Sequence, residues 1–325
     1  MSMYRNELPQ LNGMMCITDG GMETDLVFNH NIDLPEFAAY DLLRNKSGKE
    51  WLVDYFRNYV GIAQRYGLGL VLETPTWRAN REWGERIGDT PEELALFIRA
   101  GVRLLERVRS EVATGEVPVI ISGCFGPRGD GYSPAGMMSA EEARKYHGEQ
   151  MATLAGTAVD MVAALTINYP SEASGIARAA ADHGLPVCIS FTVETDARLP
   201  TGMSLAEAIA EVDEATNHYP AYYMINCAHP THFGHLFEEG GAWLERIKGL
   251  RGNASCLSHA ELDESTSLDD GDPEAFGQQL SALRAMSPHL TVLGGCCGTD
   301  HRHIESVGHH LYQQDSYGLS DLKRN

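Results

Sequence analysis

The chain has 325 residues, of which 43% are hydrophobic and 22% charged, and its 45 acidic and 25 basic residues give a formal net charge of −20. This composition is typical of a globular protein, and the negative charge argues against binding to nucleic acid or to an anionic membrane surface. The sequence has no run of 18 apolar residues and a polar N-terminal segment, so we expect no transmembrane helix and no signal peptide. Seven scattered cysteines without an export signal favour a cytoplasmic location.

Short apolar runs alternate with amphipathic stretches along the whole chain. The apolar runs predict strands at residues 15–18, 70–72, 117–123, 160–166, 186–192, 222–227, 250–256 and 290–293. Helical periodicity and capping signals predict helices at 50–66, from 90, at 139–158, at 171–183, from 204, at 232–247 with a break at Gly240-Gly241, and at 272–286 and 300–311.

Eight strand–helix units without a break in composition predict an α/β fold, a single (β/α)₈ TIM barrel that covers residues 1–325. A doubly wound open sheet is the alternative, but no Gly-x-Gly-x-x-Gly motif follows the first expected strand. In a barrel the carboxyl ends of all strands share one rim, where active sites lie. We therefore searched the expected strand ends for residues that carry chemistry.

Three cysteines stand at these strand ends: Cys227 after the sixth strand, and Cys296 and Cys297 after the eighth. Three thiolates on one rim suit Zn²⁺, and three protein ligands leave a fourth position open, as in catalytic zinc sites. The neighbouring glycines would let the backbone turn sharply enough for both adjacent cysteines to reach one metal. The alternatives are inert buried cysteines, or a non-catalytic barrel with a redox-sensitive Cys296–Cys297 pair.

A cluster of histidines offers a rival metal site. His229, His232 and His235 follow Cys227, and His301 and His303 follow the Cys-Cys turn. Histidine ligands would indicate a zinc hydrolase. Their spacing lacks the i, i+4 pair of helix-borne zinc ligands, so roles at the surface or at helix ends are favoured.

Several motifs resemble the zinc-dependent homocysteine S-methyltransferase family. They are Asp19-Gly20-Gly21-Met22-Glu23-Thr24, residues 74–80, Ser190-Phe191-Thr192, Asn226-Cys227 and Gly294-Gly295-Cys296-Cys297-Gly298-Thr299. The resemblance implies a TIM barrel that holds Zn²⁺ through Cys227, Cys296 and Cys297. It implies methyl transfer from a sulfonium or ammonium donor to homocysteine or a related thiol, in methionine biosynthesis. Because the chain ends soon after the eighth expected helix, it is more similar to the short S-methylmethionine-type enzymes than to the betaine or cobalamin enzymes.

The resemblance also implies a set of substrate-binding positions: Asp19, Gly20, Thr74, Leu165, Thr166, Asn226 and, in a looser match, Asn253. Leu165 stands where the family has the acid of a Glu-Thr pair, which holds the ammonium group of the substrate. A buried ammonium without a counter-charge is costly. Either Glu194, Glu261 or Asp263 replaces that acid, or the thiol lacks an α-amino group.

The expected partners are a small-molecule thiol and a methyl donor, with no nucleic acid and no membrane. Trp77, Tyr132 and Phe191 are aromatic candidates for contact with a cationic donor, although packing in the core is the favoured role for them. The sequence leaves the donor and the oligomeric state open, with a homo-oligomer as one alternative.

Overall fold

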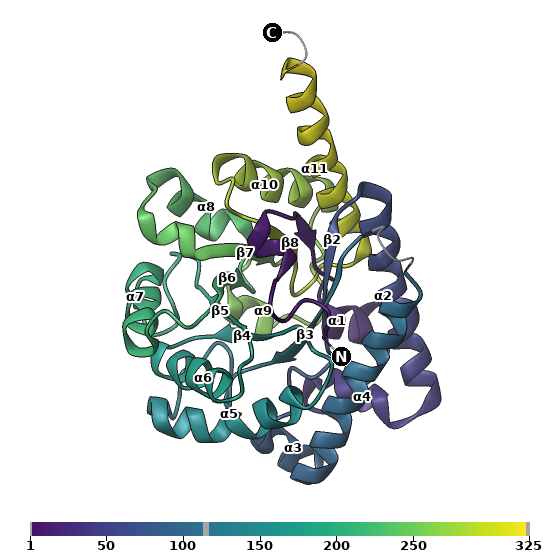
Figure 1. Cartoon of the computed structure of the whole chain (residues 1–325), viewed down its shortest axis with the longest axis vertical. Helices are drawn as coiled ribbons and strands as arrows, with labels where there is room; N and C mark the ends of the chain where they lie inside the picture. Colours follow the sequence, from purple (N-terminus) through teal and green to yellow (C-terminus); the bar gives the residue numbers. More distant parts are fainter. Residues whose placement is uncertain (1, 113–116, 323–325) are drawn as a thin grey trace.

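The computed structural model describes residues 2–112 and 117–322, and its eight parallel strands close into a barrel in sequential order (Figure 1). The strands are β1 (Cys16–Ile17), β2 (Gly69–Glu73), β3 (Val119–Phe125), β4 (Met161–Ile167), β5 (Val187–Thr192), β6 (Tyr222–Asn226), β7 (Ile247–Gly252) and β8 (Val292–Gly295). Strand β1 closes the barrel because Cys16 pairs with Gly69 of β2 and with Val292 of β8. The predicted TIM barrel is confirmed and the open sheet is wrong. The ends of the expected 1–325 domain lie outside the described residues.

The helices mostly surround the barrel as an outer ring, but the short α9 lies over its middle, and α11 extends away from it toward the C-terminus (Figure 1). They are α1 (Met22–Thr24), α2 (Lys46–Tyr66), α3 (Arg81–Ile87), α4 (Pro91–Ser110), α5 (Ala140–Ala155), α6 (Pro170–Asp182), α7 (Leu205–Thr216), α8 (Pro230–Glu239), α9 (His259–Asp263), α10 (Pro273–Met286) and α11 (His301–Leu322). The capping boxes expected at Thr90, Ser139 and Ser204 are present. None of the helices in the described part of the chain combines the length and apolar character needed to cross a bilayer.

The structure differs from the sequence prediction in several elements: α3 and α9 were not expected, α11 reaches Leu322 instead of residue 311, and β7 has other bounds. The expected break at Gly240-Gly241 is present: α8 ends at Glu239, and the two glycines adopt positive φ angles of 75° and 134° and turn the chain into a short 3₁₀ segment. Strand β7 then begins at Ile247, earlier than the predicted residue 250. The half-exposed Lys248 and the glycines of this strand obscure its apolar pattern.

The centre of the barrel is filled by side chains and is closed at its amino-terminal end. Inward-facing residues such as Val71, Ile120 and Met224 form one buried cluster that includes Leu8 from the N-terminal segment. Backbone N–H groups of Met3 and Tyr4 donate to the buried carboxylate of Asp160, which holds this segment across the bottom. The opposite rim, at the carboxyl ends of the strands, is left open.

Candidate active site

A cavity of about 490 Å³ opens at the carboxyl ends of the strands. The zinc ligands and substrate-binding positions that the family resemblance implies all line it: Asp19, Gly20, Thr74, Leu165, Thr166, Asn226, Cys227, Asn253, Cys296 and Cys297. Closure of the barrel thus brings together positions that are far apart in the sequence. Such a cavity is large enough for two small molecules at once.

The three cysteines converge at one point of this cavity. Their sulfur atoms lie within 4.8 Å of one another, and no other set of three or more His, Cys, Asp or Glu side chains in residues 2–112 and 117–322 could hold a metal ion in this way. Cys227 and Cys296 form a disulfide with Cα atoms 5.4 Å apart, and the Sγ of Cys297 lies 3.9 Å from that of Cys227. A redox pair in this site therefore joins Cys227 and Cys296, and the expected Cys296–Cys297 pairing is wrong.

The thiol of Cys297 lies deep in the site, beside Tyr132. Burial raises its pKa to about 11, although a contact with the Tyr132 hydroxyl, at 4.0 Å, acts in the opposite direction. Without a cation this group is a neutral thiol near pH 7. A bound metal ion would therefore be needed to make it a thiolate.

Local backbone geometry places the sulfurs. Cys227 adopts φ = +54°, a left-handed conformation that is uncommon outside glycine and is often found at functional sites. In the Cys-Cys turn, a Cβ at Gly295 would collide with the Thr299 side chain, and Gly298 has φ = +79°. The sharp turn expected from these glycines is present.

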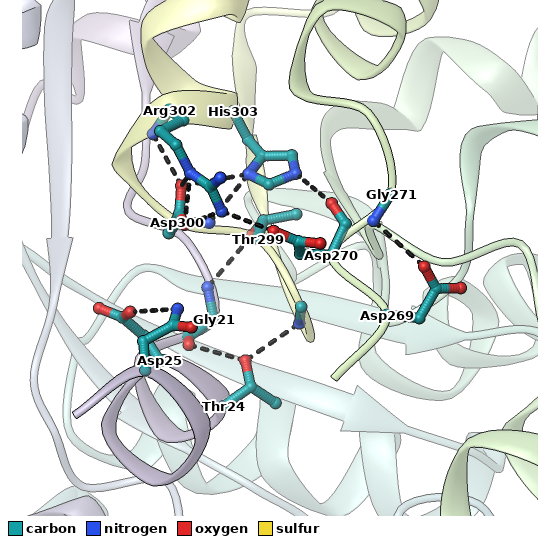
Figure 2. A network of polar contacts seen from close by, with 12 residues as sticks. Gly21, Thr24, Asp25, Asp269, Asp270, Gly271, Thr299, Asp300, Arg302 and His303 are labelled. Atoms are coloured by element: carbon teal, nitrogen blue, oxygen red, sulfur yellow. Dashed lines mark hydrogen bonds and ion pairs between the residues drawn. The ribbon is translucent and has the colours of Figure 1, made fainter. Parts of the chain in front are cut away.

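The Cys-Cys turn is fastened to the turn after β1, as Figure 2 shows. The Thr24 hydroxyl accepts a hydrogen bond from the N–H of Gly298, at 3.0 Å, and donates to the carbonyl of Gly21, at 2.9 Å. The N–H of Gly21 donates in turn to the Thr299 hydroxyl, at 3.2 Å. These bonds join strand ends that are adjacent only because the barrel closes between β8 and β1.

Asn226 and Thr166 contact the cysteine sulfurs. The Nδ2 of Asn226 donates to Thr166 Oγ1, at 2.8 Å, and lies 3.8 Å from the Sγ of Cys296. Thr166 Oγ1 lies 3.8 Å from the Sγ of Cys227. The Oδ1 of Asn226 accepts from the Ser190 hydroxyl and from the Thr166 N–H, which fixes the amide. Both side chains can therefore orient the sulfurs, in addition to lining the cavity.

Asp19 is neutralised by a buried arginine. An Nη2 of Arg251, which lies in β7, is 2.7 Å from the Asp19 carboxylate, and Tyr55 donates to the same group at 3.2 Å. Burial raises the pKa of Asp19, and the charge of Arg251 opposes this effect. Glu73 lines the cavity nearby, and burial raises its pKa to about 7. The sequence prediction did not include Arg251, because the weak apolar pattern of β7 gave no sign that this arginine is buried.

The position of the missing acid is an apolar wall. Leu165 is buried and packs against Trp77, whose indole N–H donates to the Leu165 carbonyl at 3.2 Å. Of the three proposed substitutes, Asp263 lines the cavity, whereas Glu194 pairs with His259 and Glu261 belongs to a capping box. The last two expectations are wrong, because those carboxylates are used in local contacts outside the cavity lining.

The remaining expectations concern histidines and aromatic residues. His229 caps α8, His232 contacts the Cys256 carbonyl, and His303 contacts the Asp270 carbonyl. These histidines thus make the contacts expected at helix ends and at the surface. The described chain contains no histidine metal site that would support the hydrolase alternative. Trp77 and Tyr132 line the cavity, whereas Phe191 is fully buried.

The fold and the site define a barrel methyltransferase. The family model described as Homocysteine S-methyltransferase matches residues 16–311, so the chain belongs to this family. The resemblance seen in the sequence motifs is thus confirmed.

Solved structures agree with this assignment at the level of the fold. The metallated form of the homocysteine methyltransferase MmuM from Escherichia coli is 18% identical, with a TM-score of 0.69 over 94% of this chain and 98% of that one. The oxidized form of MmuM is also 18% identical, with a TM-score of 0.68 over 92% and 97% of the two chains. No curated protein sequence gives a significant match.

Proposed function

We propose that the protein transfers a methyl group from a sulfonium or quaternary ammonium donor to the sulfur of a small thiol, with Zn²⁺ held by Cys227, Cys296 and Cys297. The convergence of three sulfur atoms within 4.8 Å at the cavity carries this proposal. Homocysteine is the leading acceptor, in line with the family and with the name of the homocysteine methyltransferase MmuM, and an S-methylmethionine-like sulfonium is the leading donor on the resemblance of the sequence motifs alone.

The sulfur positions fit zinc. Two thiolates at about 2.3 Å from a tetrahedral Zn²⁺ lie about 3.8 Å apart. The sulfurs of Cys227 and Cys297 are 3.9 Å apart, and reduction of the Cys227–Cys296 disulfide would free the third ligand at the same place. The donor set is all sulfur, which suits a soft or borderline metal ion and leaves one position open toward the cavity.

Zn²⁺ bound there would lower the pKa of the substrate thiol, so that the thiol is a thiolate at neutral pH. The protein contributes orientation, because Asn226 and Thr166 hold the sulfurs of Cys296 and Cys227. Methyl transfer between sulfur atoms needs no proton transfer at the carbon, in keeping with a site that has no nucleophile–base pair. Carboxylates on the cavity wall, Glu23, Asp130 and Asp269, favour the approach of a cationic donor.

The test is metal content and methyl transfer in matched cysteine variants. We expect about one zinc per reduced wild-type chain, and loss of most bound zinc and of methyl transfer in Cys297→Ala. The control is Cys256→Ala, since Cys256 is an exposed free thiol outside the cavity lining. Full zinc and full activity in Cys297→Ala would disprove the proposal. Zinc loss from the His229→Ala variant, with zinc kept in Cys297→Ala, would favour a histidine site.

A further inference from the structure

Arg78 is a charged residue of the cavity wall that the proposed chemistry does not use. It lies between β2 and α3 and lines the cavity. It takes part in none of the ion pairs of the described residues. Its Nε and Nη1 atoms are buried, and neither has a hydrogen-bond partner among the described residues. Buried donors of this kind are rare in native proteins and need an explanation, such as a ligand that binds them.

Two tryptophans hold the guanidinium in place. Its central carbon lies 4.2 Å from the ring centre of Trp77 and 3.5 Å from that of Trp83. Stacking of this kind fixes the plane of the guanidinium without occupying its N–H groups. The side chain is therefore rigid while its hydrogen-bond donors are unpaired, as required for recognition of a planar anion.

Among the described residues, no carboxylate forms an ion pair with Arg78. Asp130 and Glu23 are the acidic groups whose charges act on it, but neither forms an ion pair with it in the described chain. The Asp130 carboxylate accepts hydrogen bonds from the N–H groups of Tyr132 and Ser133 instead. Desolvation lowers the pKa of Arg78 to about 10, so the group is still a cation at neutral pH.

The part of the wall formed by Trp77 and Leu165 is poorly suited to an ammonium group. Trp77 joins Arg78 to the end of β4 through its hydrogen bond to the Leu165 carbonyl. At this place Leu165 provides no charge, and the guanidinium already lies against the indole that could have bound an ammonium group. Asp19 at the first strand end is paired with Arg251, and burial raises the pKa values of Glu23 and Glu73, which also line the cavity, to about 7.

Arg78 lines the same cavity as the metal-binding sulfurs. Tyr132 lies 4.0 Å from the sulfur of Cys297, and the charge of Arg78 acts on Tyr132 as well. Arg78, Tyr132 and Cys297 all line the one cavity. A short thiol with its sulfur at the cysteines can therefore direct its other end toward Arg78.

We propose that Arg78 binds the carboxylate of the acceptor thiol, and that this carboxylate, and not an α-ammonium group, is what the pocket recognises. The proposal rests on the proposed function and names its acceptor class: short aliphatic thiols that end in a carboxylate. Homocysteine belongs to this class through its carboxylate, and its deaminated analogue should serve as well.

Three thiols separate the two recognition groups: homocysteine, 4-mercaptobutyrate, which lacks the amino group, and 3-mercaptopropylamine, which lacks the carboxylate. Binding to the zinc-loaded protein is measured by calorimetry without a donor, so that a carboxylate on the donor cannot contribute. We expect homocysteine and 4-mercaptobutyrate to bind within about threefold of each other, and 3-mercaptopropylamine about 10- to 100-fold more weakly, as for loss of a charged hydrogen bond.

The matched variants are Arg78→Met and Arg86→Met. Arg86 also stacks on Trp83, at 4.2 Å, but it pairs with Glu82 and does not line the cavity. Arg78→Met should weaken both carboxylate thiols about 10- to 100-fold and leave 3-mercaptopropylamine unchanged. Arg86→Met should change none of the three. Because a purely structural role would weaken all thiols alike, the selectivity between thiols is the decisive readout.

Two outcomes overturn the inference while leaving the proposed function in place. One is tight binding of 3-mercaptopropylamine together with weak binding of 4-mercaptobutyrate, which would show that the ammonium is recognised. The other is methylation of all three thiols with equal KM in wild type and Arg78→Met. If no thiol binds to the zinc-loaded protein or is methylated by any sulfonium or quaternary ammonium donor, the proposed function itself fails.

Discussion

Asn226 shows how a single side chain can organise the site. It is completely buried, and its amide joins Thr166, Ser190 and the sulfur of Cys296. An amide that donates to a sulfur stabilises the thiolate and fixes the direction in which it points. The Asn-Cys pair of the sequence is thus one functional unit, in which the first residue positions a ligand from another strand end.

We expect Asn226→Ala to lower zinc affinity or methyl transfer about 10- to 100-fold, the usual effect of losing a partner of a metal ligand. It should also reduce the free energy of unfolding by about 1–3 kcal/mol, since the Ser190 hydroxyl and the Thr166 N–H lose their acceptor. Zinc titration and urea unfolding measure both effects. Asn253→Ala is the control for metal binding, because Asn253 lines the cavity without contacting a sulfur. Unchanged zinc affinity in Asn226→Ala would contradict this role.

The turn from β8 into α11 is the element that presents two of the three cysteines. Asp300 begins α11: its carboxylate accepts from the N–H of Arg302 at 2.8 Å and from the Arg302 guanidinium at 2.7 Å. Arg302 also reaches Asp270, and His303 bonds to the Asp270 carbonyl (Figure 2). The Cys-Cys turn is therefore supported by a polar network on its carboxyl-terminal side.

This network makes part of the stability pH-dependent. Burial by itself raises the pKa of Asp300, but the hydrogen bonds from His303 and Arg302 outweigh it and hold the pKa well below its usual value. A carboxyl with a lower pKa in the folded state contributes stability that is complete above the unfolded pKa of about 3.9 and is lost as pH falls below it.

We therefore expect Asp300→Asn to cost about 1–3 kcal/mol of unfolding free energy at neutral pH. The difference from wild type should shrink by about 1 kcal/mol near pH 3, where the unfolded wild-type carboxyl is mostly protonated. Urea unfolding of both proteins at the two pH values provides the measurement. An equal difference at both would mean that Asp300 does not stabilise the fold through its charge.

Considered as a whole, the barrel does not depend on the metal-binding residues. The strands close through backbone pairing from β1 to β8, and Cys227 and Cys297 stand just beyond the strand ends. The interior is packed by apolar residues below the cavity. We therefore expect the fold to be the same in the reduced, metal-bound and oxidised forms of the site.

We expect oxidation to join Cys227 to Cys296 and to exclude zinc. Thiol titration of the unfolded oxidised protein should find two fewer thiols than in the reduced protein, and zinc should bind only after reduction. Far-UV circular dichroism should be the same for the oxidised, metal-free and zinc-loaded forms, while zinc raises the unfolding midpoint by mass action. Loss of the helical signal on chelation would show that zinc is structural. Tight zinc binding by the oxidised protein would contradict the shared site.

Much of this architecture was predictable because it depends on local patterns. Apolar runs, capping boxes such as Thr90 with Glu93, and the Gly-Gly-Cys-Cys-Gly turn each act through residues close in the chain. Strand β7 was misplaced for the same reason, since its own residues carry a weak pattern. The roles of the substrate-binding residues and the single-domain organisation stay predictions.

The alternation of strands and helices, and the cysteines at their ends, were readable from residue order alone, because strand and turn propensities are local. The partners of the charged residues were not. Arg251 binds the carboxylate of Asp19, which is 232 positions away in the sequence. Trp77 stacks on Arg78 and donates a hydrogen bond to the Leu165 carbonyl at another strand end. Such contacts exist only after the barrel closes. The tertiary structure determines which buried charges have a partner. It pairs Asp19 with Arg251 and leaves buried N–H groups of Arg78 without one among the described residues.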